Sequence, residues 1–263
     1  MRRFDDEDLT GAVFRECDLS GTRMVGVVMH GAEIDGLVTR LVVNGVEVMT
    51  YVEAELDRRH PVRLLLRSDR PDDLREAWQQ LRQAWSATTA LARSLPAGTE
   101  HRSVGGEWST VQTLRHLVFV HDSWFRRCVL GRTEPFTSLG LGPAVLMDGA
   151  GGLDPTAAPS LSEVLAVREE QALELQAWLA TVTPDRLAQP APVPDDDRWP
   201  TYARGRTVRQ CLGTVLEEEW AHHGFAARDL EVLSRAAPGS GLTLAVAADP
   251  SRPRLSRGTP SRA

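Results

Sequence analysis

Hydrophobic residues near the N-terminus recur every five residues, a period that fits neither an α-helix nor a flat β-strand. Such a period fits a four-sided coil in which one large side chain fills the centre on each side. We therefore expect these side chains, the period-five residues, to be buried. The seven period-five residues are Phe4, Leu9, Phe14, Leu19, Met24, Met29 and Ile34.

The glycines of this segment follow a five-residue register of their own, which includes Gly11, Gly21 and Gly26. Together the two registers resemble those of pentapeptide-repeat proteins, and the resemblance implies a right-angled β coil over residues 4–38. An irregular, strand-rich lead-in is the alternative. Seven pentads are few for a solenoid, so we expect the coil to depend on packing against the domain that follows.

A β-hairpin is predicted for residues 41–52, because Asn44-Gly45 is a strong two-residue turn signal between runs of β-branched residues. Residues 52–60 predict a short helix that ends before Pro61. The coil and the hairpin thus make up one predicted unit of residues 1–60.

From residue 61 onward the hydrophobic pattern becomes helical. Pro71 and Ser109 mark the starts of two helices, Gly131 ends the second, and Ser160 or Ser162 caps a third. The connections before and after the third helix are long and rich in Gly, Pro or Asp. The four predicted helices span residues 72–95, 109–130, 160–182 and 207–233.

Four long helices with long second and third connections predict a mainly α protein whose principal domain is a four-helix bundle. We expect this domain to span residues 61–236. Residues 237–263 contain much Pro, Gly, Ser and Arg and few large apolar side chains, which predicts a disordered tail.

Composition narrows the classes of function. The formal net charge is −6, so no basic surface favours binding to nucleic acid or to a membrane. No apolar run reaches the ~20 residues of a membrane helix, and the N-terminus is too charged for a signal peptide. The three widely spaced cysteines have no metal-binding or disulfide spacing, so we expect a protein of the reducing cytoplasm.

The fourth predicted helix contains a cluster of ionisable residues. A glutamate and a histidine four residues apart share one face of a helix and can share one metal. The pairs Glu218/His222 and Glu219/His223 both have this spacing. On a helical wheel Glu219 lies nearest the centre of the apolar stripe and Glu218 farthest from it. The interpretation without a metal is a solvated acidic edge beside hydrogen-bonded core histidines.

The second predicted helix contains two further histidines, His116 and His121. The apolar stripe of this helix includes the position of His121. His116 lies on the flank of the stripe beside small residues, which suit a pocket wall. Periodicity alone therefore favours His121 as a third ligand.

Trp108-Ser109 followed after six residues by His116-Leu117, with Glu-x3-His on the last helix, resembles the DinB/YfiT-like superfamily over residues 72–235. The resemblance implies zinc or a similar divalent metal, bound by one histidine of the second helix and a pair on the fourth. It assigns His116 and not His121, and it leaves both Glu/His pairs open. The commoner pair is His-x3-His, so the glutamate favours the mycothiol-dependent branch.

This branch implies a metal-dependent thiol transferase or isomerase that uses a low-molecular-weight thiol such as mycothiol on a small metabolite, with specialised metabolism as one setting. All 30 basic residues are arginine, as a GC-rich actinobacterial genome would explain, and this agrees with mycothiol. A homodimer is compatible with the sequence. The residues expected to grip the thiol, unless they are ordinary surface residues, are Trp199, Tyr202, Arg204 and Arg206.

Two other functions remain open on the sequence. The bundle could be a metal-stabilised module without catalytic activity, whose coil binds another protein. Alternatively, the open metal position holds an activated water, which would make the protein a metal-dependent hydrolase. Turnover without any thiol would distinguish the hydrolase, and a stable protein partner would distinguish the module.

Overall fold

The computed structural model describes residues 3–14, 17–34, 36, 38–142, 152–154 and 156–236. Its contacts divide the chain into two compact units, Met1–Glu53 and Ala54–Ala263. The predicted tail of residues 237–263 lies outside the described residues. None of the described helices is long and apolar enough to cross a membrane.

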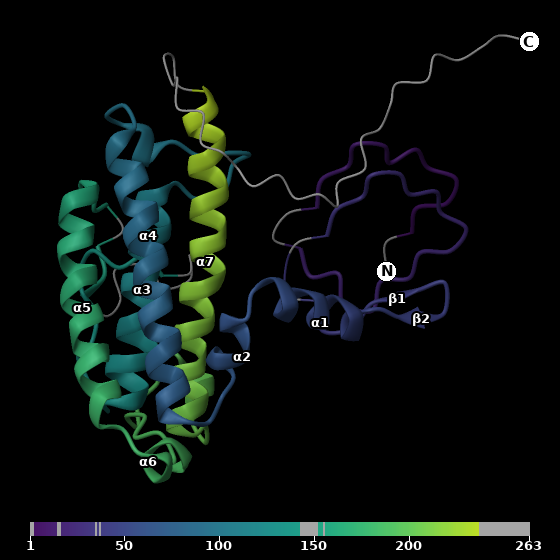
Figure 1. Cartoon of the computed structure of the whole chain (residues 1–263). Coiled ribbons are helices and arrows are strands. Elements are labelled where there is room, and N and C mark those ends of the chain that lie inside the picture. The colour runs from purple at the N-terminus through teal and green to yellow at the C-terminus, as the bar shows by residue number, and fades with distance from the viewer. Residues whose placement is uncertain are drawn as a thin grey trace, which may run out of the picture. The chain divides into compact units, whose positions relative to one another are not determined.

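The N-terminal unit begins with a winding coil of tight turns (Figure 1). In one such turn the amide of Ala12 donates to the carbonyl of Leu9 at 2.9 Å, and Gly11 between them has a φ of 75°. The Asp8 carboxylate accepts a hydrogen bond from the Thr10 amide at 3.0 Å. Because glycine adopts a positive φ without steric cost, the turn explains why glycine recurs in the pentads.

Our expectation that the period-five residues are buried is wrong, because their exposed fractions lie between 45% and 58%. Some apolar neighbours are exposed still further, since Val13 and Val28 reach 83% and 82%. The physical reason is the shortness of the coil. A solenoid turn buries its centre only when another turn stacks on it, and seven pentads give fewer than two four-sided turns.

The predicted hairpin is present but short. It consists of two antiparallel strands, β1 (Val42–Val43) and β2 (Val46–Glu47). Asn44 and Gly45 have φ values of 50° and 85°, as a type I′ turn requires. The chain then enters helix α1 (Met49–Arg59). The Glu47 carboxylate accepts a hydrogen bond from the Met49 amide at 2.9 Å, which gives the first amide of the new helix a partner.

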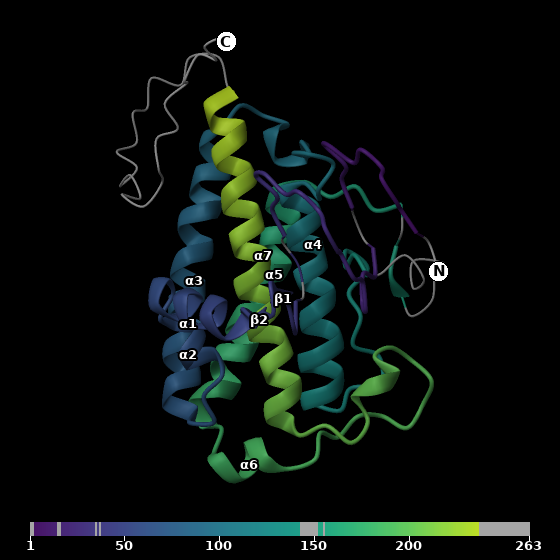
Figure 2. The ribbon, with the colours of Figure 1, turned by 90° about the vertical axis from the view of Figure 1, so that its right-hand side faces the viewer.

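The second unit contains the predicted four-helix bundle (Figure 1, Figure 2). Helix α3 packs against α5 and α7, and α4 packs against the same two helices. The long helices are α3 (Pro71–Ser94), α4 (Thr110–Val120), α5 (Leu161–Thr181) and α7 (Val208–Ala236). The connections contain the short helices α2 (Val62–Leu66) and α6 (Pro184–Ala188) and the 3-10 turns Thr99–His101 and Thr201–Ala203.

Counted together with the π-helix that continues α4 to Val129, the long helices begin and end within three residues of the predicted positions. Local capping signals fix several of these ends. The Ser109 hydroxyl accepts from the Gln112 amide at 3.3 Å, while the Gln112 side chain accepts from the Ser109 amide at 2.9 Å. Ser160 and Glu163 form the same reciprocal capping box at the start of α5.

Two apolar clusters fill the bundle, and a belt of polar side chains separates them. On α7 the buried members of the first cluster end at Leu216, and those of the second begin at Ala226. The belt between them includes Arg168 and Gln171 of α5 and Glu219 of α7, none of them more than 8% exposed. Buried polar groups require partners, so the belt sets the level at which the helices must align.

Helix α4 continues without a break as a π-helix, His121–Val129, and all nine of these residues are buried. A π-helix takes more residues per turn than an α-helix, so side chains beyond Val120 point in directions that an α-helical wheel does not give. The π-helical segment brings the polar side chains of Asp122, Arg126 and Arg127 into the interior.

Candidate metal site

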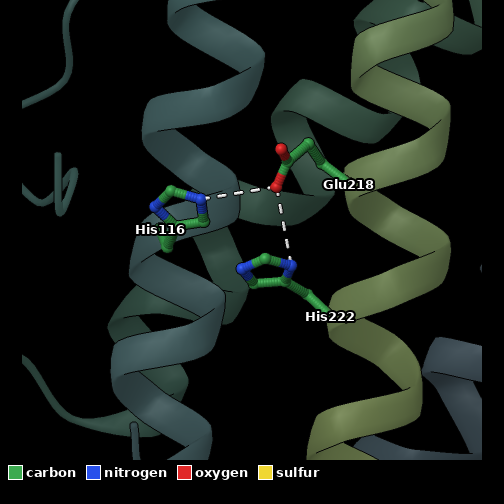
Figure 3. Close-up of side chains that lie close together, drawn as sticks. All are labelled: His116, Glu218 and His222. Atoms are coloured by element: carbon green, nitrogen blue, oxygen red, sulfur yellow. Dashed lines mark ion pairs between the residues drawn. The ribbon is translucent and has the colours of Figure 1, made fainter. Parts of the chain in front are cut away.

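Three side chains from two facing helices meet at the level of the polar belt: His116 of α4 and Glu218 and His222 of α7 (Figure 3). Oε2 of Glu218 lies 3.5 Å from Nε2 of His116 and 3.5 Å from Nδ1 of His222. One ligand atom from each residue lies within 4.8 Å of the other two. At this spacing a single cation can contact all three residues.

Aromatic side chains surround the two imidazoles. The rings of His116 and His222 stack with centroids 4.7 Å apart and an interplanar angle of 19°. Trp108, which precedes α4, lies 4.8 Å from the His116 ring and 6.2 Å from the His222 ring. Phe119 and Phe225 lie 6.2 Å and 5.6 Å from the ring nearest to each. This packing restricts the rotamers of both histidines and so preorganises the site.

The loop that follows the π-helix fixes the orientation of His116. Its Nδ1 lies 3.1 Å from the carbonyl oxygen of Leu141, an acceptor that keeps a proton on Nδ1, so Nε2 is the ring nitrogen that faces Glu218 and that a metal would bind. The Leu141 amide donates to the Arg115 carbonyl at 3.0 Å. The Arg115 guanidinium in turn donates to the Leu139 carbonyl at 2.9 Å. The loop is thereby fastened to α4 beside the candidate ligand.

The charge states of the site suit metal ligands. Burial raises the pKa of Glu218, but the interaction of its carboxylate with the His116 and His222 imidazoles outweighs burial, so this pKa lies below its usual value. Burial, aided by the charge of His116, lowers the pKa of His222 to about 4. At neutral pH Glu218 is therefore an anion and His222 is neutral, which are the forms that bind metals.

The residues present fit a divalent metal. Two imidazoles and one carboxylate form a donor set that zinc takes in sites that keep a fourth position open. Nδ1 of His222 is buried and has no hydrogen-bond partner within the described part of the chain, so it lacks the partner that a buried polar atom needs. The Glu218 side chain is 35% exposed, so a small molecule can reach the three residues.

The alternative pair, Glu219 and His223, is directed elsewhere. Glu219 is 1% exposed, and its Oε1 accepts a hydrogen bond from Arg168 of α5 at 2.5 Å. Nε2 of His223 lies 2.9 Å from the hydroxyl oxygen of Thr88 on α3. The helical wheel correctly placed Glu219 on the core side of α7, but a wheel cannot show which residue of a neighbouring helix pairs with it.

His121, which periodicity favoured as a ligand, faces α5 and not α7. Its Nε2 lies 3.4 Å from Oε2 of Glu174, and its side chain is 1% exposed. Burial lowers the pKa of His121 to about 4 despite the hydrogen bond to Glu174. The structure therefore places His121 in the buried polar interior, and it brings His116 to the site as the resemblance implied.

Three of the four residues expected to grip a thiol form one cluster. Tyr202 lies edge-on to Trp199 with ring centroids 5.1 Å apart, and the Arg206 guanidinium lies 5.7 Å from the Tyr202 ring. Trp124 of the π-helix completes the cluster, 5.5 Å from Tyr202 and 5.1 Å from the Arg206 guanidinium. Arg204 does not join it, because its guanidinium binds the acidic loop that precedes it.

Sequence reasoning missed Trp124, Leu141 and Thr214 as parts of this region. Leu141 acts through its backbone carbonyl, which leaves no signal in the side-chain pattern. Trp124 follows the start of the π-helix and was beyond the reach of an α-helical wheel. Thr214, whose hydroxyl accepts a hydrogen bond from Arg206 at 3.4 Å, lies one turn before Glu218 on α7, and that four-residue spacing was the one available signal.

The fold and these residues define a four-helix bundle with a candidate site for a divalent metal between α4 and α7. Residues 80–226, more than half of the chain, match the family model of the DinB superfamily, and the protein belongs to this superfamily, which includes metal-binding members. Residues 4–36 match a family model whose description is pentapeptide repeats (8 copies), and this match confirms the predicted repeat. No curated protein and no solved structure gives a significant match.

Proposed function

We propose that the protein is a metal-dependent thiol transferase or isomerase that uses a low-molecular-weight thiol such as mycothiol on a small metabolite. The observation that carries this proposal is the trio of His116, Glu218 and His222, which is preorganised and partly open to solvent. Three protein ligands leave one position of a tetrahedral metal for an exogenous group. A bound dication would lower the pKa of a thiol from about 8.5, so that the thiolate forms near neutral pH.

The residues around the trio prepare it for that role. The Leu141 carbonyl keeps a proton of His116 on Nδ1, so that Nε2 is the nitrogen available to coordinate a metal. Trp108 covers both imidazoles and limits the access of water to them. The chain thus needs no nucleophile of its own. Cys128 and Cys211 are both buried, and the Cys128 thiol donates to the Ser123 carbonyl at 3.1 Å, so neither cysteine is presented as an exposed nucleophile.

The cluster of Trp199, Tyr202, Arg206 and Trp124 supports binding of the body of the thiol. Aromatic faces stack on sugar rings and apolar surfaces, and Tyr202 is 52% exposed and so available for contact. Arg206 offers hydrogen-bond donors beside these rings. In this proposal the sulfur lies at the trio and the rest of the molecule extends toward the cluster.

Metal analysis and thiol titration test the proposal. We expect about one divalent metal per chain and a change in the visible spectrum of the cobalt-substituted protein when mycothiol is added. Thiol binding should release about one proton near neutral pH, which calorimetry in two buffers of different ionisation enthalpy detects. His116→Ala should lose most of the metal, whereas His223→Ala should retain it.

Three results would overturn the proposal. Equal metal content in the wild type and in His116→Ala would remove the site. Turnover of a substrate without any thiol would identify a hydrolase. Failure of metal-loaded protein to bind mycothiol, bacillithiol or ergothioneine would remove the thiol as co-substrate.

A further inference from the structure

Arg206 has an unusual position for a half-buried arginine, because no carboxylate of the described residues pairs with it. Its Nη1 donates to the Thr214 hydroxyl oxygen at 3.4 Å, the one side-chain hydrogen bond of this guanidinium within the described ranges. A guanidinium carries five N–H donors, so most of them remain available. By contrast, Arg126 and Arg168 each pair with a glutamate in the interior of the bundle.

Two aromatic rings hold this guanidinium in place. Its carbon atom lies 5.1 Å from the centroid of the Trp124 ring and 5.7 Å from that of Tyr202, both within the range of cation–π contacts. The rings also displace water from the cation, which increases the strength of its interaction with an anion. Arg206 is therefore oriented and partly desolvated, yet no carboxylate in the described part of the chain neutralises it.

Arg206 is connected to the helix of the candidate metal site through its hydrogen bond to Thr214 of α7. Thr214, Glu218 and His222 follow one another at intervals of four residues, so they share one face of the helix, and all three are half-buried. Thr214 precedes Glu218 by one turn, a rise of about 6 Å. Burial raises the pKa of Tyr202, the Arg206 cation opposes this rise, and the Glu218 carboxylate adds to it, so Tyr202 is within electrostatic reach of the site.

We infer that Arg206, between Trp124 and Tyr202, is an anion subsite that binds a carboxylate of the small molecule held at the candidate metal site. The inference rests on the proposed function and adds the class of ligand, a carboxylate-bearing thiol or acceptor. A carboxylate matches the planar, two-pronged geometry of a guanidinium. A neutral ligand would leave the cation without a counter-charge.

Thiols of graded length test the subsite in cobalt-substituted full-length protein. The probes are ω-mercaptocarboxylates, from mercaptoacetate to 6-mercaptohexanoate, and the alcohols of matching length. In the wild type the carboxylate should bind more tightly than the matching alcohol, by about tenfold at the best chain length. The preference should be absent for mercaptoacetate and appear in the longer probes, because a short probe cannot join the metal to the Arg206 guanidinium.

Variants connect the preference to Arg206. Arg206→Met keeps the length of the side chain and should abolish the preference, whereas Arg206→Lys keeps the charge and should retain part of it. Arg198→Met is the matched control, an exposed arginine whose partner Glu134 is also exposed, and it should leave the preference unchanged. If Arg206→Met does not fold, Arg206→Lys still tests the inference. A smaller preference in Arg206→Lys than in the wild type, with Arg198→Met unchanged, would support it, and a preference in Arg206→Lys equal to that of the wild type would overturn it.

A second arm separates the two sources of the carboxylate and the two proposals. Hexanoate, which has no thiol, is titrated into protein saturated with 6-mercaptohexanol and into metal-free protein, with tryptophan fluorescence as the readout. Hexanoate binding that depends on Arg206 would assign the carboxylate to the acceptor, and it would support the subsite even if no thiol binds to the metal. A carboxylate preference in Arg206→Met, or no carboxylate effect in either arm, would overturn the inference.

Discussion

Adjacent residues on α7 carry carboxylates in opposite situations. Glu218 is 35% exposed and lies between two imidazoles, whereas Glu219 is 1% exposed and pairs with Arg168. At the residue scale this difference separates a group available to a ligand from a group that holds the interior together. Substitution of each glutamate by glutamine removes the charge with little change in shape, so the two variants are a matched pair.

Glu218→Gln should remove most of the metal with little effect on stability, because an amide oxygen is a weaker ligand and the position is partly solvated. Glu219→Gln should retain the metal and lower the free energy of unfolding by about 3 kcal/mol, because it leaves the buried Arg168 guanidinium without its counter-charge. Metal analysis and urea unfolding of both variants measure this. The reverse pattern would assign the metal to Glu219 and His223.

His121 makes the stability of the bundle depend on pH. Burial lowers the pKa of His121 to about 4, below the value of about 6.5 in an unfolded chain. As the pH falls through this window the unfolded chain takes up the proton first, so the free energy of unfolding decreases, by about 3 kcal/mol in total for this residue. The pKa of Glu174 is lowered to about 2, mainly by its hydrogen bond with His121, so Glu174 remains charged throughout.

His121→Gln, which keeps a hydrogen-bond donor for Glu174, should therefore show a flatter dependence of stability on pH than the wild type. Urea unfolding of metal-free protein between about pH 7 and about pH 4 measures the difference. The charged groups that face His121 are Glu174, Arg126 and Arg168, and the substitution retains all of them. His101→Gln, at an exposed position, is the control, and identical profiles for the wild type and His121→Gln would contradict the prediction.

At the scale of elements, the long helices could be predicted because their signals are local. Ser109 and Ser160 each cap a helix through contacts three residues away, and these contacts are visible in the sequence. The π-helix from His121 to Val129 could not be predicted, because the deviation depends on how α4 packs against its neighbours. For the same reason, periodicity favoured His121 over His116.

The loop after the π-helix offers a test of how an element outside the bundle supports the site. Arg115 donates to the carbonyls of Leu139 and Ala157 at 2.9 Å and 2.7 Å and so fastens the segment that carries Leu141. Arg115→Met should weaken metal binding by about tenfold, because the partner that orients His116 becomes mobile. Competition with a chelator measures the affinity, and hydrogen exchange at the Leu141 amide reports the mobility.

Two controls make this prediction specific. Arg198→Met, at an exposed arginine of another loop, should change neither the metal affinity nor the exchange at Leu141. Faster exchange with unchanged affinity would show that the Leu141 carbonyl is dispensable for His116. Unchanged exchange would show that the loop is held by contacts other than those of Arg115.

At the scale of the whole molecule, the sequence predicted the kinds of architecture but not the extent of burial. The five-residue register of Phe4 to Ile34 identified the repeat, because the register is a property of each pentad. Burial of those side chains depends on turns stacked above and below, and a coil this short supplies too few. Likewise, the wheel placed Glu219 in the core, but its partner Arg168 lies 51 residues earlier in the chain.

The bundle should hold its metal without the N-terminal coil. Every buried apolar residue in the described chain lies at or beyond Leu66, and the three candidate ligands lie between His116 and His222. A chain of residues 49–236, which begins with α1, should therefore bind the metal with the stoichiometry of the full protein. Its melting temperature should lie within about 4 °C of the full-length value, the shift expected for about 1 kcal/mol in a domain of this size. Metal analysis and thermal unfolding measure both quantities.

The truncated chain also assigns a role to the coil. If it binds metal and retains the thiol-dependent cobalt spectrum, catalysis resides in the bundle and the half-exposed period-five residues serve another purpose. If it folds and binds metal but loses the thiol response, the coil contributes to the functional site. Loss of both fold and metal would contradict the prediction, because it would mean that residues before Met49 stabilise a bundle whose buried core begins at Leu66.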